Sequence, residues 1–311
     1  MGAMSAVLTT TSPANTVPRT PKAAIETAIL QTVAYVDEFD YPLTAGEVHH
    51  YLIGVSATRE QVEVSLGNGR LIPHRLSRQD NYFMLPGRES LAAIRQQRQH
   101  IAQQMWPQAL KYGRLMAHLP FVRMVAVTGS LAVNNAIEGA DIDYLVITEN
   151  GRLWLTRAFV ICIVRLAARW GISLCPNYFL TQRALHIADQ NLYTAHELVQ
   201  MIPLSGLDVY YHLQKANSWT GHYLPNARWS GSGQSYTPPA YHPRRLAELT
   251  LNATIGTHLE QWEMNRKIRK FSRWQTAEAD FSPDWCKGHI DDHARRILEN
   301  FANRTKTFTN P

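Results

Sequence analysis

Two β-branched runs near the middle of the chain each meet polar residues at one end. The run Val122–Thr128 is apolar and ends at Gly129 and Ser130, whereas Asp141–Thr148 alternates and opens with Asp-Ile-Asp. Alternation with a period of two over about four to eight residues is typical of a β-strand. The two runs therefore predict neighbouring strands of a small sheet whose polar groups gather at one edge.

The residues at this edge suit a nucleotide and a divalent cation. Gly129 has no Cβ, so its backbone can approach a phosphate closely, and Ser130 adds a hydroxyl at the start of an expected helix with free N–H groups. Asp141 and Asp143 lie two apart on a strand and therefore point to the same face. Two such carboxylates repel each other unless a cation lies between them, and Mg²⁺ bound by carboxylates and phosphates fits. A plain turn followed by a solvated edge strand explains less well why acids interrupt an apolar run.

The order Gly129, Ser130, a gap of about ten residues, then Asp141 and Asp143 resembles the motif of the polymerase β-like nucleotidyltransferase superfamily. The resemblance covers about residues 121–180. It implies an α+β fold whose core is a small mixed sheet with helices. It also implies transfer of a nucleoside monophosphate from a triphosphate, with ATP as the expected nucleotide and Mg²⁺ or Mn²⁺ held by the two aspartates.

One position departs from that family pattern. The superfamily usually carries a third carboxylate on the next strand, and here the residue in that place is Asn177. An amide oxygen can bind a metal, but it cannot accept a proton as a base. Either Asp141 and Asp143 suffice with Asn177, or Glu138 or Asp208 completes the set, or the domain binds a nucleotide without transferring it.

Two basic residues outside the motif are further candidates. Arg157 lies one turn into the helix expected after Asp143, where it could reach a triphosphate. A surface position or an ion pair within the chain is an equal alternative. Lys287 would reach the nucleotide if the C-terminal segment folded back onto the core.

The N-terminal part predicts three short helices followed by a hairpin, the order of a winged helix-turn-helix. Capping boxes, in which Thr44 pairs with Glu47 and Thr58 with Gln61, mark the starts of the second and third helices. We expect the hairpin strands at 70–76 and 81–85.

DNA is a possible partner of this winged-helix-like domain. Arg59 and Gln61 on the expected recognition helix are residues that read bases, whereas Glu60 and Glu63 oppose a phosphate backbone. A role in packing or in protein interaction is the stronger reading of this domain.

Five segments are expected along the chain. They are a disordered segment 1–22, the winged-helix-like domain 23–88, a nucleotidyltransferase domain 89–228, a linker 229–243 and a helical region 244–311. A single long helix is expected over 243–274.

The composition indicates the kind of partner and the cellular location that we expect. The net charge of +6 and the pI near 9.3 suit an anionic partner such as a nucleotide. The three cysteines form no disulfide framework, so we expect free thiols and a cytoplasmic location. The most apolar stretch, Ala158–Ala168, contains Arg165 and is too short to span a bilayer, so no membrane partner is expected.

Two functions follow as hypotheses. The first is an Mg²⁺-dependent nucleotidyltransferase whose acceptor, a small molecule, a protein or a nucleic acid, the sequence leaves open. The second is a catalytically impaired nucleotide-binding regulator whose winged helix contacts DNA or a protein.

Overall fold

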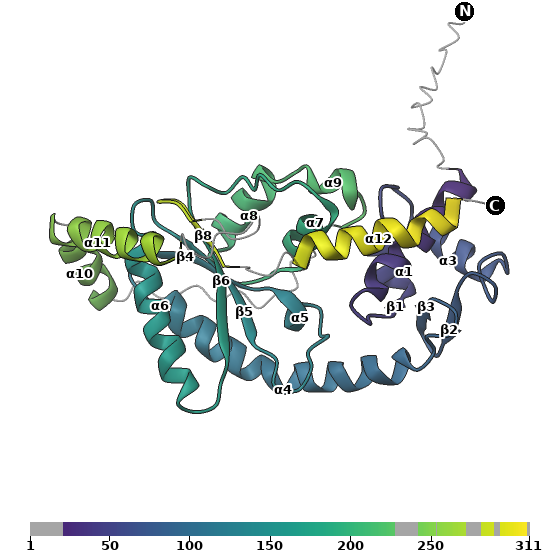
Figure 1. The fold of residues 1–311 in the computed structure, drawn as a ribbon, viewed down its shortest axis with the longest axis horizontal. Helices are drawn as coiled ribbons and strands as arrows, with labels where there is room; N and C mark the ends of the chain where they lie inside the picture. The colour runs from purple at the N-terminus through teal and green to yellow at the C-terminus, as the bar shows by residue number, and fades with distance from the viewer. Residues whose placement is uncertain (1–20, 228–241, 253, 272–280, 289–292, 310–311) are drawn as a thin grey trace, which may run out of the picture.

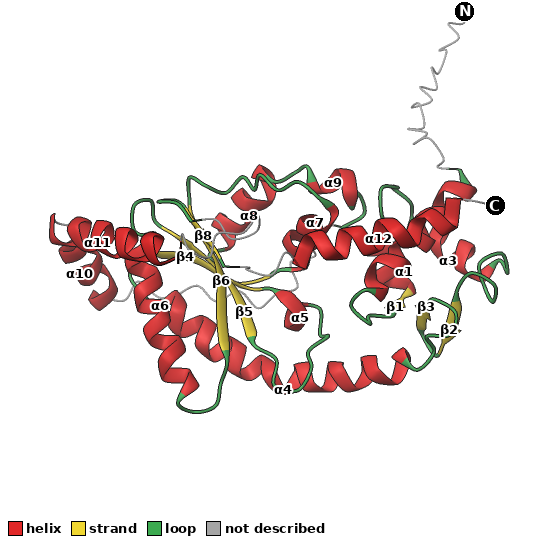
Figure 2. Ribbon diagram, viewed as in Figure 1, coloured by secondary structure: helices red, strands yellow, loops and turns green. Residues whose placement is uncertain are grey.

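We describe the chain from a computed structural model. The described residues are 21–227, 242–252, 254–271, 281–288 and 293–309. Residues 1–20 of the expected disordered segment and most of the expected linker lie outside these residues, whereas Lys22, expected at the end of that segment, begins a helix. Helices and two sheets together confirm the α+β class (Figure 2).

The N-terminal part consists of three helices and a small antiparallel sheet with strand order β1-β3-β2. In chain order the elements are α1 (Lys22–Asp37), β1 (Leu43–Thr44), α2 (Ala45–His50), α3 (Arg59–Gly67), β2 (Ser77–Gln79) and β3 (Tyr82–Met84). Both predicted capping boxes are present, because each threonine hydroxyl accepts from the backbone three residues on and the Glu47 and Gln61 side chains return the bond.

The hairpin is shorter than predicted, and its first strand begins later. The segment expected as a strand at 70–76 is a turn, in which the amides of Arg75 and Leu76 donate to the Leu71 carbonyl at 2.7 and 2.8 Å. Pro73 has no amide hydrogen for a ladder, which favours this turn over a strand.

A single long helix, α4 (Leu91–Ala117), connects the N-terminal part to the larger sheet (Figure 1). Pro107 lies inside it, and the helix continues through that residue. The buried side chains of Tyr112 and Met116 pack on the sheet, so burial of this face stabilises the helix despite the missing amide hydrogen.

The larger sheet has the strand order β7-β4-β5-β6-β8. Its elements and neighbouring helices are β4 (Val122–Val127), α5 (Gly129–Ala132), β5 (Ile142–Thr148), α6 (Leu153–Ala168), β6 (Leu174–Thr181), α7 (Leu192–Gln200), β7 (Ile202–Ser205), α8 (Leu207–Ala216) and α9 (Thr220–Tyr223). Strands β5 and β6 run parallel and are joined through α6, while the other neighbouring strands are antiparallel. The sequence predicted β4, β5 and β6 but did not predict β7, which has only four residues.

The C-terminal region packs onto the rest of the chain. It contains α10 (His242–Leu251), α11 (Thr254–Phe271), β8 (Trp285–Lys287) and α12 (His293–Thr309). The single helix predicted over 243–274 is therefore wrong, and two shorter helices take its place. Separate helices let Glu248 accept from the Phe121 amide at 2.8 Å and Glu260 accept from the Trp154 amide at 2.9 Å.

Strand β5 divides the interior into two cores. Tyr144 and Val146 face the core formed with α4 and α6, while Leu145 and Ile147 face the core shared with α7, α8 and the N-terminal helices. By strand alternation Asp143 belongs to the second face. Within the described part of the chain, no helix combines the length and the apolar character needed to cross a membrane.

Substitutions at two glycines test the placement of β7 beside β4. Gly206, which precedes α8, has φ +72°, and a Cβ there would overlap the Arg123 carbonyl, whereas Gly139 has φ +74° and open space around it. Gly139→Ala should cost about 1 to 2 kcal/mol of unfolding free energy from left-handed strain alone. Gly206→Ala should cost at least about 2 kcal/mol more or fail to fold. Urea denaturation measures both, and equal losses would contradict the placement of β7 beside β4.

Candidate functional site

The end of β4 and the start of β5 meet at Gly129 and Asp143. Gly129 has φ +64°, and a Cβ on it would overlap the Asp143 carboxylate. The amide of Thr128 also donates to the Asp143 carbonyl at 3.1 Å. Glycine is therefore required here by the carboxylate as well as by the backbone conformation.

Asp143 is half-buried and has two polar neighbours on β6. The Asn177 side-chain amide donates to its Oδ1 at 3.2 Å, and the Cys175 thiol hydrogen-bonds to the same carboxylate. Burial raises the pKa of Asp143 to about 6, with a further contribution from Asp141, although the Cys175 bond opposes the shift. Burial and these two acids raise the pKa of the Cys175 thiol to about 12, so the thiol stays protonated.

A β-bulge directs Asn177 toward Asp143. The pairing of β5 with β6 shifts between Tyr144, which is opposite Pro176, and Leu145, which is opposite Tyr178. Asn177 is thus the extra residue, and proline beside it cannot donate to the ladder. The Asn177 carbonyl accepts from the Gly288 amide at 2.9 Å, which ties the bulge to the C-terminal segment.

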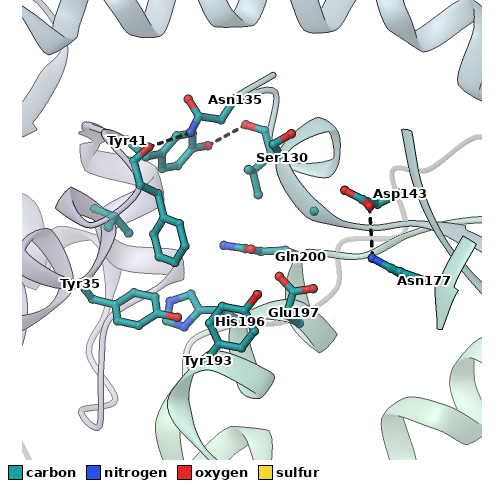
Figure 3. Close-up of a pocket in the computed structure, with 14 residues that line it drawn as sticks. Tyr35, Tyr41, Ser130, Asn135, Asp143, Asn177, Tyr193, His196, Glu197 and Gln200 are labelled. Carbon is teal, nitrogen blue, oxygen red and sulfur yellow. Dashed lines mark hydrogen bonds between the residues drawn. The ribbon is translucent and has the colours of Figure 1, made fainter. Parts of the chain in front are cut away.

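Asp143 faces a cavity of about 270 Å³ between the sheet and the N-terminal part (Figure 3). One wall comes from α1 and the turn after it, another from α5 and its loop, and a third from α7. The lining residues are Tyr35, Val36, Phe39, Tyr41, Gly129, Ser130, Val133, Asn135, Asp143, Asn177, Tyr193, His196, Glu197 and Gln200. The cavity therefore has an acidic end at the sheet and an aromatic end at α1.

Glu197 is a second acid of this cavity and was not predicted. It lies on α7 beside the buried residues Ala195, His196 and Leu198. Burial, together with the charge of Asp143, raises the pKa of Glu197 to about 7. The signal in the sequence is an acid flanked by the core positions of an apolar helix, where charged groups are costly.

The motif residues are only partly brought together. Gly129, Ser130, Asp143 and Asn177 line the cavity, but Asp141 precedes β5 and is exposed outside the lining. The expected helix after Gly129 is only four residues long, so its dipole contributes little to anion binding.

Arg157 does not share this cavity. Its guanidinium lies over the rings of Phe271 and Phe179, at 5.2 and 5.9 Å from the ring centroids, on the α6 face of the sheet. That is the face opposite Asp143, so a nucleotide over Asp143 would not reach it. The expected contact of Arg157 with a triphosphate stays a prediction, and it would require a nucleotide outside this cavity.

The alternative acids also lie elsewhere. Glu138 is exposed and borders a depression beside α4, and Asp208 is exposed on α8. Lys287 on β8 lies beside β6, opposite Tyr178, so the C-terminal segment does fold back onto the core.

The donor set of the cavity suits a cation carried with a substrate. Two carboxylates, those of Asp143 and Glu197, line it without any lysine or arginine among the lining residues. Over the described ranges no three His, Cys, Asp or Glu side chains converge to hold a metal ion. Mg²⁺ commonly takes one or two carboxylates and completes its shell with phosphates and water, so the Asp143 carboxylate fits it as a protein ligand.

No protein-family model matches this chain, and neither a curated protein nor a solved structure shows significant similarity to it.

The raised pKa of Glu197 predicts how stability depends on pH. The folded pKa of about 7 exceeds the ordinary value of 4.5, so stability from the protonated form is complete below 4.5 and lost as pH rises through 7. Glu197→Gln should therefore unfold at higher urea than the parent protein above pH 7. The gain should be of the order of 2 to 3 kcal/mol and vanish toward pH 4.5.

The matched control for that series is Glu60→Gln, which alters an exposed acid on α3. It should shift the urea midpoint little at any pH. A Glu197→Gln protein with no pH-dependent gain would show that Glu197 is not desolvated.

Proposed function

We propose that this protein is an Mg²⁺-dependent nucleotidyltransferase with a polymerase β-like core and a winged-helix-like N-terminal domain. The observation that carries the proposal is the close approach of the Asp143 carboxylate to Gly129 in the lining of one cavity. Because Gly129 has no side chain, the Asp143 carboxylate can lie beside it, where β4 ends and β5 begins.

The electrostatics of the cavity support a bound cation. The pKa values of Asp143 and Glu197 are both raised, chiefly by burial, so the cavity disfavours their charged forms when no cation is present. Asp143 would hold Mg²⁺, and Asp141, which is exposed just before β5, is the remaining carboxylate of the motif. Bound there, the ion would neutralise the triphosphate and stabilise the charge that develops during transfer.

The aromatic end of the cavity suits the nucleobase. Tyr35, Phe39, Tyr41 and Tyr193 supply ring surfaces, and such rings stack on bases without requiring one particular base. Ser130 lies at the other end beside Asp143, where the phosphates would lie. We propose ATP as the first nucleotide to test.

In this reading the winged-helix-like domain forms a wall of the site. Its α1 supplies Tyr35 and Val36 to the cavity, and the turn after α1 supplies Phe39. The exposed face of α3 is not basic, because Arg59 is paired with Glu63 at 2.8 Å and Glu60 is exposed beside it. Packing of α1 against the core is thus better supported than DNA reading.

A variant of Asp143 tests the proposal. Asp143→Asn should keep the fold and lower transfer of label from α-labelled ATP into cell-extract acceptors by about 10² to 10³-fold or more, since the metal loses its buried ligand. Affinity for Mg²⁺ with a non-hydrolysable ATP analogue, measured by calorimetry, should fall in parallel.

Glu138→Gln is the matched control, because Glu138 is an exposed acid between the two halves of the motif. It should leave both measurements unchanged. If Asp143→Asn binds and transfers like the parent protein, the nucleotide does not lie at this cavity.

One observation favours the second function, a nucleotide-binding regulator. Asn177 donates to Asp143 where the superfamily usually has a third carboxylate, so β6 supplies no base. A regulator should shift genomic DNA fragments in a gel assay in a nucleotide-dependent way. A transferase that merely uses its N-terminal domain for packing should show no such shift.

A further inference from the structure

A second cavity lies next to the first. It occupies about 450 Å³ between α7, β8 and α12. Its apolar part comes from Tyr178, Ile187, Tyr193 and Leu298. Pockets of about 300 to 1,000 Å³ with an apolar floor and a few polar groups are typical of small-molecule sites.

The two cavities share part of their lining. Glu197 and Tyr193, both on α7, line each of them. In Figure 3 the Glu197 carboxylate projects from α7 toward the space that Asp143 borders from the sheet. Glu197 therefore borders both the space beside Asp143 and the second cavity.

Glu197 is half-buried, although its neighbours Ala195, His196 and Leu198 on α7 are buried. Its side chain borders both cavities, so a ligand in either cavity can lie beside it. A titratable group in such a place is a candidate for a functional role.

We propose that the second cavity binds the acceptor and that Glu197 is the general base that takes the proton of its hydroxyl group. This inference rests on the proposed nucleotidyl transfer. The acceptor oxygen forms a bond to the α-phosphorus, the bond from that phosphorus to the bridging oxygen breaks, and pyrophosphate leaves. The hydroxyl proton goes to Glu197, which supplies the base that Asn177 cannot.

The charges of the second cavity indicate the class of acceptor. Three acids, Asp189, Glu197 and Glu299, face two cations, and one of these, Lys287, is paired with Asp189 at 2.6 Å. Binding of a nucleic acid depends on cations that neutralise phosphates, and this lining has no surplus of them. The acceptor is an uncharged or zwitterionic hydroxyl compound of low molecular mass with an apolar face.

The pKa of Glu197, raised to about 7 by burial and by Asp143, is consistent with this role. A general base works best when its pKa is close to the working pH. Other titratable groups near it are Tyr35, Tyr193 and His196 in the first cavity and Lys287, Arg295 and Glu299 in the second.

The test uses the full-length protein, α-labelled ATP, Mg²⁺ and a cell extract separated by ultrafiltration into low-mass and macromolecular fractions. The parent protein should label a compound of the low-mass fraction. Glu197→Gln should lower this transfer by about 10² to 10⁴-fold. Its affinity for Mg²⁺ with the non-hydrolysable ATP analogue should stay within about threefold of the parent value, because nucleotide binding does not need the base.

A bulky residue tests the second cavity separately. Ala294 lines it from α12, so Ala294→Trp should raise the KM for the low-mass fraction by about tenfold or more without changing nucleotide affinity. Ala93→Trp, on the exposed face of α4, is the matched control and should behave like the parent protein, as should Glu138→Gln.

The outcomes separate the two proposals. Transfer by Glu197→Gln at the parent rate, label on nucleic acid or protein, or an unchanged KM in Ala294→Trp would overturn this inference and leave nucleotidyl transfer standing. Both proposals would be overturned if the parent protein transferred no label and if Asp143→Asn bound the nucleotide with the affinity of the parent protein.

Discussion

The site depends on the close approach of the Asp143 carboxylate to the Cα of Gly129. A side chain at that position would occupy the space of the carboxylate and would also be strained at φ +64°. The pairing of β4 with β5 sets this approach, and the Asn177 bulge on β6 completes the surroundings of the acid. This end of the sheet thereby forms an acidic wall of the cavity. The arrangement places the Asp143 carboxylate partly out of water, which disfavours its charged form.

The negative charge of these acids is not balanced by any positively charged residue in the cavity lining. Asp143 and Glu197 share one cavity whose lining holds no lysine or arginine, and burial raises the pKa of each. Arg157, the arginine that the sequence suggested for this site, lies over Phe271 and Phe179 on the opposite face. Because a protein would gain stability by replacing such acids with amides, their presence favours a role that needs a cation.

The local parts of this arrangement could be predicted from the sequence, and the long-range parts could not. The capping boxes and strands β4, β5 and β6 follow from short patterns, as does the position of Gly129 next to an acid-bearing strand. Glu197 was missed because it approaches Asp143 only after α7 packs across more than fifty residues of chain. Strand β8 was missed for the same reason, since three residues acquire a strand conformation only by pairing with β6.

Both ends of the chain hold the walls of the two cavities. Helix α12 lies against α1 and α7 (Figure 1), and Arg304 pairs with Asp37 and, at 2.7 Å, with Glu38 at the end of α1. Through Gly288, the C-terminal segment also bonds to the bulge that aims Asn177. The acidic cavity is thus bounded by α1 from the N-terminal part, and the second cavity by α12 from the C-terminal part. Helix α12 therefore lines the second cavity and also contacts α1, which lines the first, so both cavities depend on the packing of this C-terminal helix.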